Sequence, residues 1–116
     1  MQNFEKIKLN RDFHRLYTRG KSKVTPLFVV YTAKGRKGKL RLGITVGKKI
    51  GGAVQRNRAK RLITAAFRSL TPNLTQGYDV VIVARVRVLA FKSTQIAELL
   101  KKQFTEIGLW CENESD

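Results

Sequence analysis

The stretch that decides the fold is GKKIGGAVQRNRAKRLITAAFR, residues 47–68. From Ala53 to Leu70 the chain contains no Gly or Pro, and apolar side chains recur at helical spacing: Ala59, Leu62, Ile63, Ala66, Phe67 and Leu70. Such a stripe predicts an amphipathic helix that packs on a core along one side. The glycines at 51 and 52 predict a turn just before this helix.

The opposite face of the expected helix is cationic. It carries Asn57, Lys60, Arg61, Thr64 and Arg68, with Arg56 and Arg58 at its edges. Exposed helix faces usually mix both signs, because like charges four residues apart, such as Arg56 and Lys60, destabilise a helix. A polyanionic partner explains this uncompensated charge better than simple solvation does. We therefore expect the face to bind phosphate groups.

Composition extends this charge to the whole chain. The 116 residues suffice for one domain with a modest core, and the net charge of +16 favours a nucleic acid or another anionic surface as partner. Residues 13–78 contain 16 Lys or Arg and no Asp or Glu. The single cysteine, Cys111, excludes an intramolecular disulfide and is typical of a reducing compartment. No apolar run is long enough for a signal peptide or a membrane span, so we expect a cytoplasmic protein.

The segments before the basic helix show shorter patterns. They predict a loosely ordered arm (1–9), a helix (11–19) capped by Asn10 and ended by Gly20, a basic linker (21–23), a strand (27–33), a hairpin loop (33–39) and a strand (39–47). The last of these alternates clearly, with apolar side chains on one side and Arg41, Gly43 and Thr45 on the other.

After the basic helix, the nearly continuous apolar run at 79–89 predicts a central strand that is covered on both faces. A last helix would begin at Ser93 or Thr94 and end at Gly108. The elements fit one sheet with helices packed on it, in a single RNA-binding domain over 1–116 with flexible ends at about 1–9 and 109–116.

The run KKIGGAVQRNRAKRLITAAFR, with Arg56-Asn57-Arg58 followed by Lys60-Arg61, resembles the RNR signature of the bacterial ribonuclease P protein family. DFHRLY, LFVVYT, LRLGITVGKK and VIVAR occur in the family's order, so the resemblance covers nearly the whole chain. It implies an α+β fold of the α/β sandwich type: one central four-stranded sheet, topology αβββαβα, with a left-handed βαβ crossover as in a ribosomal-protein domain. It also implies that the protein assists a catalytic RNA in removing the 5′ leader from precursor tRNA.

The resemblance assigns two surfaces by matching residues. The first would bind the catalytic RNA through Lys48, Lys49, Arg56, Asn57, Arg58, Lys60, Arg61 and Arg68. The second, a cleft between the first helix and the sheet, would bind the leader through Phe13, Tyr17, Val29, Tyr31, Arg85 and Arg87. The residue types agree with these roles, because aromatic rings stack on unpaired bases while cations follow the backbone. Phe13 has a second possible role as a core residue.

Two positions depart from the family's pattern. Thr64-Ala65 stand where a charged pair is common, so the expected phosphate contact at position 64 is missing. Val86 stands where a polar or basic residue is expected, and Arg85 and Arg87 would carry that contact instead.

The chain has no pattern of a nuclease in its own right. Metal-assisted hydrolysis needs clustered oxygen ligands, and acid–base cleavage needs paired groups that titrate near neutrality. The basic body offers no carboxylate cluster, and His14, the only histidine, is expected at the surface or in the groove. We therefore expect no catalytic or metal-binding residue in the protein, and Mg²⁺ held mainly by the RNA.

The expected partners are the catalytic RNA of ribonuclease P and precursor tRNA, with no membrane and no obligate protein partner. The alternative is a structural RNA-binding protein, such as a ribosomal component, and basic charge alone does not separate the two. The RNR signature and the aromatic cleft favour the first. DNA binding is a weaker alternative, because the sequence shows no helix-turn-helix pattern.

Overall fold

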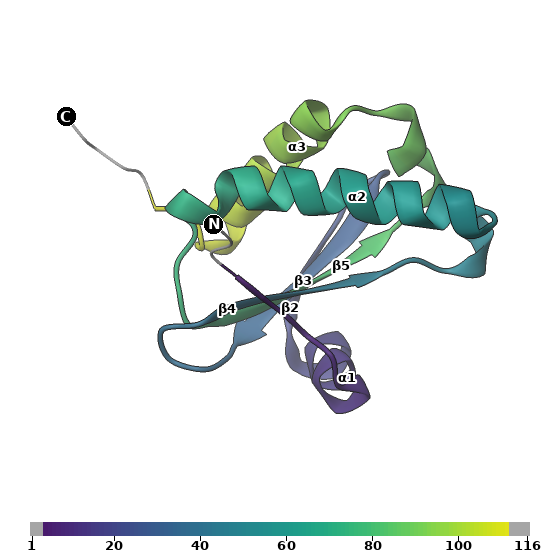
Figure 1. The fold of residues 1–116 in the computed structure, drawn as a ribbon. Helices are drawn as coiled ribbons and strands as arrows, with labels where there is room; N and C mark the ends of the chain where they lie inside the picture. The colour runs from purple at the N-terminus through teal and green to yellow at the C-terminus, as the bar shows by residue number, and fades with distance from the viewer. Residues whose placement is uncertain (1–3, 112–116) are drawn as a thin grey trace.

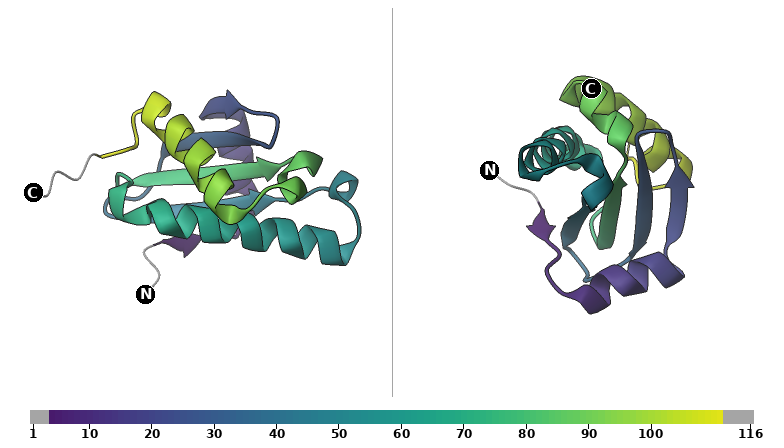
Figure 2. Two further views of the ribbon diagram at one scale, coloured as in Figure 1. Left: turned by 90° about the horizontal axis from the view of Figure 1, so that it is seen from above. Right: turned by 90° about the vertical axis from the view of Figure 1, so that its right-hand side faces the viewer.

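The computed structural model describes residues 4–111. One mixed five-stranded sheet, in the order β1-β4-β5-β3-β2, lies between helices. Helix α1 (Asn10–Arg19) covers one face, and α2 (Ala53–Leu70) and α3 (Ser93–Ile107) cover the other (Figures 1 and 2). The strands are β1 (Glu5–Lys6), β2 (Lys21–Val24), β3 (Phe28–Lys34), β4 (Leu40–Thr45) and β5 (Tyr78–Ala84).

Helix α2 confirms the basic helix expected from the sequence. Its apolar stripe is buried against the sheet and α3 through Ala59, Ile63, Ala66, Phe67 and Leu70. Gly51 has a φ of 138°, which favours glycine, and starts the turn into the helix. The Gln55 side chain then accepts a hydrogen bond of 3.1 Å from the Gly52 N–H, which satisfies a free donor at the helix start.

Strand β5 is the central strand, as expected, but it is shorter than the predicted 79–89. It pairs in parallel with β4 and antiparallel with β3, and these ladders end at Thr45↔Val83 and Phe28↔Ala84. Beyond Ala84 the Arg85 N–H still donates a 3.0 Å hydrogen bond to the Leu27 carbonyl, and the chain then forms the 3₁₀ helix η3 (Val86–Ala90). Arg87, which the predicted strand would have included, lies in this 3₁₀ helix.

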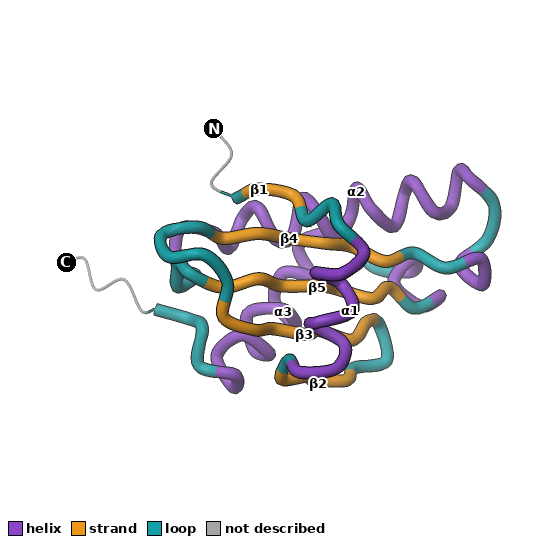
Figure 3. Tube along the Cα trace, turned by 90° about the horizontal axis from the view of Figure 1, so that it is seen from below, coloured by secondary structure: helices purple, strands orange, loops and turns teal. Residues whose placement is uncertain are grey.

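The hairpin predicted over 33–39 is wrong. Strands β3 and β4 are not neighbours, because β5 lies between them, as Figure 3 shows from below. The strand that pairs with both is β5, which follows α2 in the sequence. A local pattern of strand, glycine loop and strand contains no information about such a distant partner. The connection from β4 through α2 to β5 is a crossover between parallel strands.

The N-terminal segment differs from the expected loose arm. Residues of β1 pair in parallel with β4, at Glu5↔Arg41 and Lys6↔Leu42, which adds a fifth strand to the expected four. Phe4 and Ile7 on either side are only 6% exposed. The predicted linker at 21–23 also belongs to the sheet, as part of β2. At the other end, Leu109 is buried, and residues 112–116 of the predicted flexible tail lie outside the described range.

The two faces of the sheet are covered unequally. The α2 and α3 side holds the main core, whereas the α1 side has a small cluster of Ile7, Leu16 and Val81. One ten-residue helix leaves part of that face open. Within residues 4–111, no helix is both long and apolar enough to cross a bilayer.

Candidate RNA-binding surfaces

The outward face of α2 and the turn before it carry the first predicted set of residues. Lys48 and Lys49 are exposed in the 3₁₀ helix η1 (Lys48–Ile50), and Arg56 is half-buried at the start of α2. The other members are exposed along the helix: Asn57, Arg58, Lys60, Arg61 and Arg68. A shallow hollow of about 660 Å³ between α2 and β1 is lined by Lys6, Asn57, Lys60, Arg61, Thr64, Ala65 and Arg68. We call this hollow the cationic groove.

No cation of the cationic groove forms an ion pair with a carboxylate within residues 4–111. The ion pairs of that range use Arg15, Lys23, Lys39 and Arg41 instead. Arg68 lies over the Phe4 ring, with its guanidinium carbon 5.7 Å from the ring centroid, which fixes the stem and leaves N–H donors available. The geometry therefore confirms a cationic helix face without internal compensation.

The aromatic members of the second set meet between α1 and the sheet. The rings of Tyr17 and Tyr31 are 5.1 Å apart edge to face, and Phe13 lies 6.4 Å from Tyr17. The Tyr17 hydroxyl and Thr45 Oγ1 share a hydrogen bond of 2.6 Å. An open hollow of about 530 Å³ beside them is lined by Asn10, Phe13, His14, Tyr17, Ile44, Thr45, Val46 and Lys60. We call it the aromatic groove. Lys60 also lines the cationic groove.

Strand register places Val29 next to this groove. Val24, Val29, Val83 and Thr45 are neighbours across four strands, on the face that α1 only partly covers. At the far end of this row, Arg85 and Arg87 line a separate shallow hollow with Val24, Thr25, Pro26 and Val86. Nη1 of Arg85 donates a 3.1 Å hydrogen bond to the Thr25 carbonyl. The second predicted set is thus divided: Phe13 and Tyr17 line the aromatic groove, and Arg85 and Arg87 line the other hollow. Val29 and Tyr31 line neither hollow.

Phe13 serves as both core and groove residue. Its ring lies directly over Gly43, where an added Cβ would come within 2.7 Å of the ring carbons. It packs against the small cluster of Ile7, Leu16 and Val81, yet it remains half-buried and lines the aromatic groove. The two roles left open by the sequence are therefore compatible.

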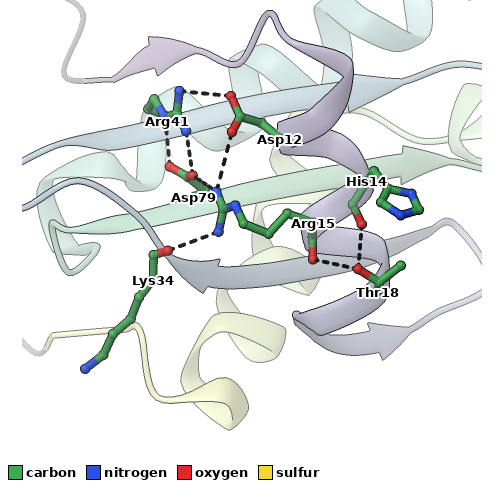
Figure 4. Close-up of polar contacts among 7 residues, drawn as sticks. All are labelled: Asp12, His14, Arg15, Thr18, Lys34, Arg41 and Asp79. Carbon is green, nitrogen blue, oxygen red and sulfur yellow. Dashed lines mark hydrogen bonds and ion pairs between the residues drawn. The ribbon is translucent and has the colours of Figure 1, made fainter.

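Sequence reasoning missed an ionic cluster beneath α1, drawn in Figure 4. Asp79 at the start of β5 is fully buried, and it accepts hydrogen bonds of 2.9 and 2.7 Å from Nε and Nη2 of Arg41. Arg15 of α1 donates to the same carboxylate and, at 3.2 Å, to the Lys34 carbonyl. Asp12 lies 3.5 Å from Nη1 of Arg41. The cluster joins α1 to β4 and β5.

The charges of this cluster set the pKa values of its members. Burial alone would raise the pKa of Asp79, but hydrogen bonds and charge from Arg41 and Arg15 outweigh it and hold that pKa below its ordinary value. The hydrogen bond to Asp79 correspondingly raises the pKa of Arg41. Asp79 therefore stays ionised at neutral pH.

The described residues do not fit a protein-held metal ion. Residues 4–111 contain no group of three or more His, Cys, Asp or Glu side chains that could bind one. The carboxylates of Asp12 and Asp79 both form ion pairs with Arg41.

Comparisons with known proteins agree with this geometry. A family model described as Ribonuclease P matches residues 1–108. The "Ribonuclease P protein component" of an Exiguobacterium species is 36% identical over 110 residues, which cover 95% of this chain and 96% of that one. The solved ribonuclease P protein of Staphylococcus aureus is similar with a TM-score of 0.77 at 33% identity, covering 90% of this chain and 96% of that one.

The solved ribonuclease P protein of Thermotoga maritima is similar with a TM-score of 0.78 at 30% identity, covering 88% of this chain and 96% of that chain. The family match over nearly all residues, the identities and the shared fold agree with one another. The chain belongs to the family of bacterial ribonuclease P protein components, the protein part of an endoribonuclease holoenzyme.

Proposed function

We propose that this protein binds the catalytic RNA of ribonuclease P through the outward face of α2 and the 5′ leader of precursor tRNA in the aromatic groove. Binding of both would support endonucleolytic removal of the leader. The observation that carries the proposal is that the cationic groove and the aromatic groove are adjacent, because Lys60 lines both. One protein could therefore hold the catalyst and its substrate together.

The aromatic groove supports this proposal over a purely structural role in an RNA assembly. A scaffold protein needs cations for folded RNA, which is bound mainly through its phosphates. Rings open to solvent, such as Tyr17, suit the stacking of unpaired bases, which a single-stranded leader provides. Arg85 and Arg87 would follow the leader's backbone further along the same face.

The chemistry would belong to the RNA, because the carboxylates within residues 4–111 form no group that could hold Mg²⁺. The protein would reduce repulsion between the phosphates of catalyst and substrate and would hold the leader. We infer a cytoplasmic location for this complex, and a left-handed β4–α2–β5 crossover as the family resemblance implies.

The test is cleavage of a precursor tRNA at low Mg²⁺ with the cognate catalytic RNA alone, the protein alone, and both together. The proposal expects efficient cleavage at the 5′ end of the mature tRNA only in the mixture. A precursor with a leader of one nucleotide serves as the matched substrate, because it cannot reach the groove.

If the protein leaves the rate of the RNA unchanged, the structural role replaces the proposal. If it raises the rate equally for long and very short leaders, the catalytic-RNA contact stands and the leader contact fails.

A further inference from the structure

The short strand β1 presents its lysine to α2. Paired residues of neighbouring strands share a face of the sheet, and Lys6 pairs with Leu42, whose side chain lies in the core under α2. Glu5 points to the other face, where it forms an ion pair of 3.1 Å with Lys39. The register therefore places Lys6 and the carboxylate of Glu5 on opposite faces of the sheet.

Phe4 fixes this strand against α2. Its ring packs edge to face on Phe67 at 5.1 Å and lies beneath the guanidinium of Arg68. Since Phe4 is only 6% exposed, the backbone just before Lys6 is anchored in the core. Lys6 is exposed, and its backbone is fixed beside the groove because β1 pairs with β4 and is anchored by Phe4.

Lys6 lines the cationic groove at the place where α2 lacks a cation. Along the groove, Arg61 and Arg68 are seven residues apart, about 10 Å along the helix, and the uncharged Thr64 lies between them. Thr64 and Lys6 line this groove together, and they line a second hollow beside it as well. Lys6 forms no ion pair within residues 4–111.

We propose that Lys6 is a further binding residue for the catalytic RNA, contacting a phosphate beside Thr64, and that β1 extends the RNA-binding surface of α2. The inference rests on the proposed role of the α2 face. It assigns a function to a segment whose sequence suggested only a loose arm.

The test measures binding of the full-length protein to its catalytic RNA at several salt concentrations, for the wild type and three variants. Lys6→Ala should weaken binding roughly three- to tenfold and lower the slope of log affinity against log salt by about one. Lys8→Ala is the matched control, since Lys8 is exposed nearby but lines neither hollow, and it should stay within about twofold of the wild type. Lys6→Ala combined with Thr64→Arg should recover most of the affinity and the slope, because the new cation occupies the same groove.

Unfolding midpoints confirm that each variant is folded, and the Thr64→Arg rescue separates a lost charge from a distorted strand. Equal affinities for Lys6→Ala and Lys8→Ala would overturn the proposal. So would a defect of Lys6→Ala that appears only with precursor tRNA present, since Lys6 would then contact the substrate. Failure of the wild type itself to bind the RNA would instead contradict the proposed function of the α2 face.

Discussion

At the scale of single residues, Tyr31 probes the aromatic groove through Tyr17, a lining residue whose ring it contacts. It extends from the middle of β3, where strand pairing on both sides fixes its backbone, and its ring contacts Tyr17. Tyr31→Ala should reduce affinity of the holoenzyme for precursor tRNA by about 1–3 kcal/mol, the value of one stacked base. Affinity for mature tRNA, which has no leader, should change much less. Equilibrium binding of both RNAs measures the difference.

Tyr31→Phe is the control, because it keeps the ring and removes only the hydroxyl. It should bind precursor tRNA nearly as well as the wild type. If Tyr31→Ala weakened binding of precursor and mature tRNA equally, the groove would not be the leader site.

At the scale of elements, the ionic cluster determines how α1 is held on the sheet. Asp79→Asn would remove the buried carboxylate that Arg41 and Arg15 both contact, and would leave them only Asp12, at 3.5 and 3.9 Å. Removing one partner of a buried ion pair costs about 3–5 kcal/mol. Because the Arg15 side chain is partly exposed, we expect a loss of unfolding free energy at the lower end, about 3 kcal/mol. Denaturant unfolding measures this loss.

Glu5→Gln is the matched control, because the Glu5–Lys39 pair is half exposed on both sides. Exposed pairs contribute about 0–1 kcal/mol, so this variant should unfold almost as the wild type does. Equal losses for the two variants would mean that the cluster does not stabilise the docking of α1.

The depressed pKa of Asp79 predicts an acid limit of stability. In the unfolded chain this carboxyl takes up a proton near its ordinary pKa of about 3.9, whereas the folded form resists protonation to lower pH. Its contribution is therefore complete above that value and is lost as the pH falls towards the pKa of the folded form. Wild-type unfolding free energy should decline more steeply below about pH 4 than that of Asp79→Asn. Parallel curves would contradict the assignment.

The sequence predicted those elements whose pattern is local. Helix α2 has its stripe, its glycine turn and its cations within one continuous run, and it forms as expected. Strand β1 was missed because two residues have no period. Its contacts come from distant parts of the chain: it pairs with β4, and Phe4 and Ile7 on either side are buried in the two clusters. The order of β3, β5 and β4 depends on pairing across α2, and the local loop at 33–39 therefore suggested a hairpin.

The candidate site was predictable to a similar degree. The cations of α2 lie on one helix face by spacing alone, and alternation places Val29 and Tyr31 together on β3. Asp79 could have been recognised from the sequence, because a single carboxylate at the start of a buried apolar strand predicts a cation close to it in the fold. Its partners, Arg41 and Arg15, come from two other elements, so only the fold identifies them.

At the scale of the whole molecule, the net charge of +16 makes RNA affinity depend on salt. Arg58 and Arg61 are exposed on the outer side of α2 and support no described ion pair, so Arg58→Ala with Arg61→Ala should leave the fold intact. The pair of changes should weaken binding of the catalytic RNA and reduce the salt slope by about two. An unchanged slope, measured by titration at several salt concentrations, would exclude phosphate contacts by both arginines.

Arg58 and Arg61 are exposed on α2, whereas Tyr31 packs with the small cluster on the α1 side of the sheet, and this predicts that their contacts with RNA act independently. Energetic effects of sites more than about 7–10 Å apart without shared partners add to within about 0.5 kcal/mol. Helices α2 and α1 lie on opposite faces of the sheet (Figure 2), and Tyr31 packs with the cluster on the α1 side. We therefore expect the losses from Arg58→Ala/Arg61→Ala and from Tyr31→Ala to add when the protein binds the complex of catalytic RNA and precursor tRNA. A triple variant that loses clearly less than the sum would show coupling, and Lys60, which lines both grooves, would be the first residue to substitute.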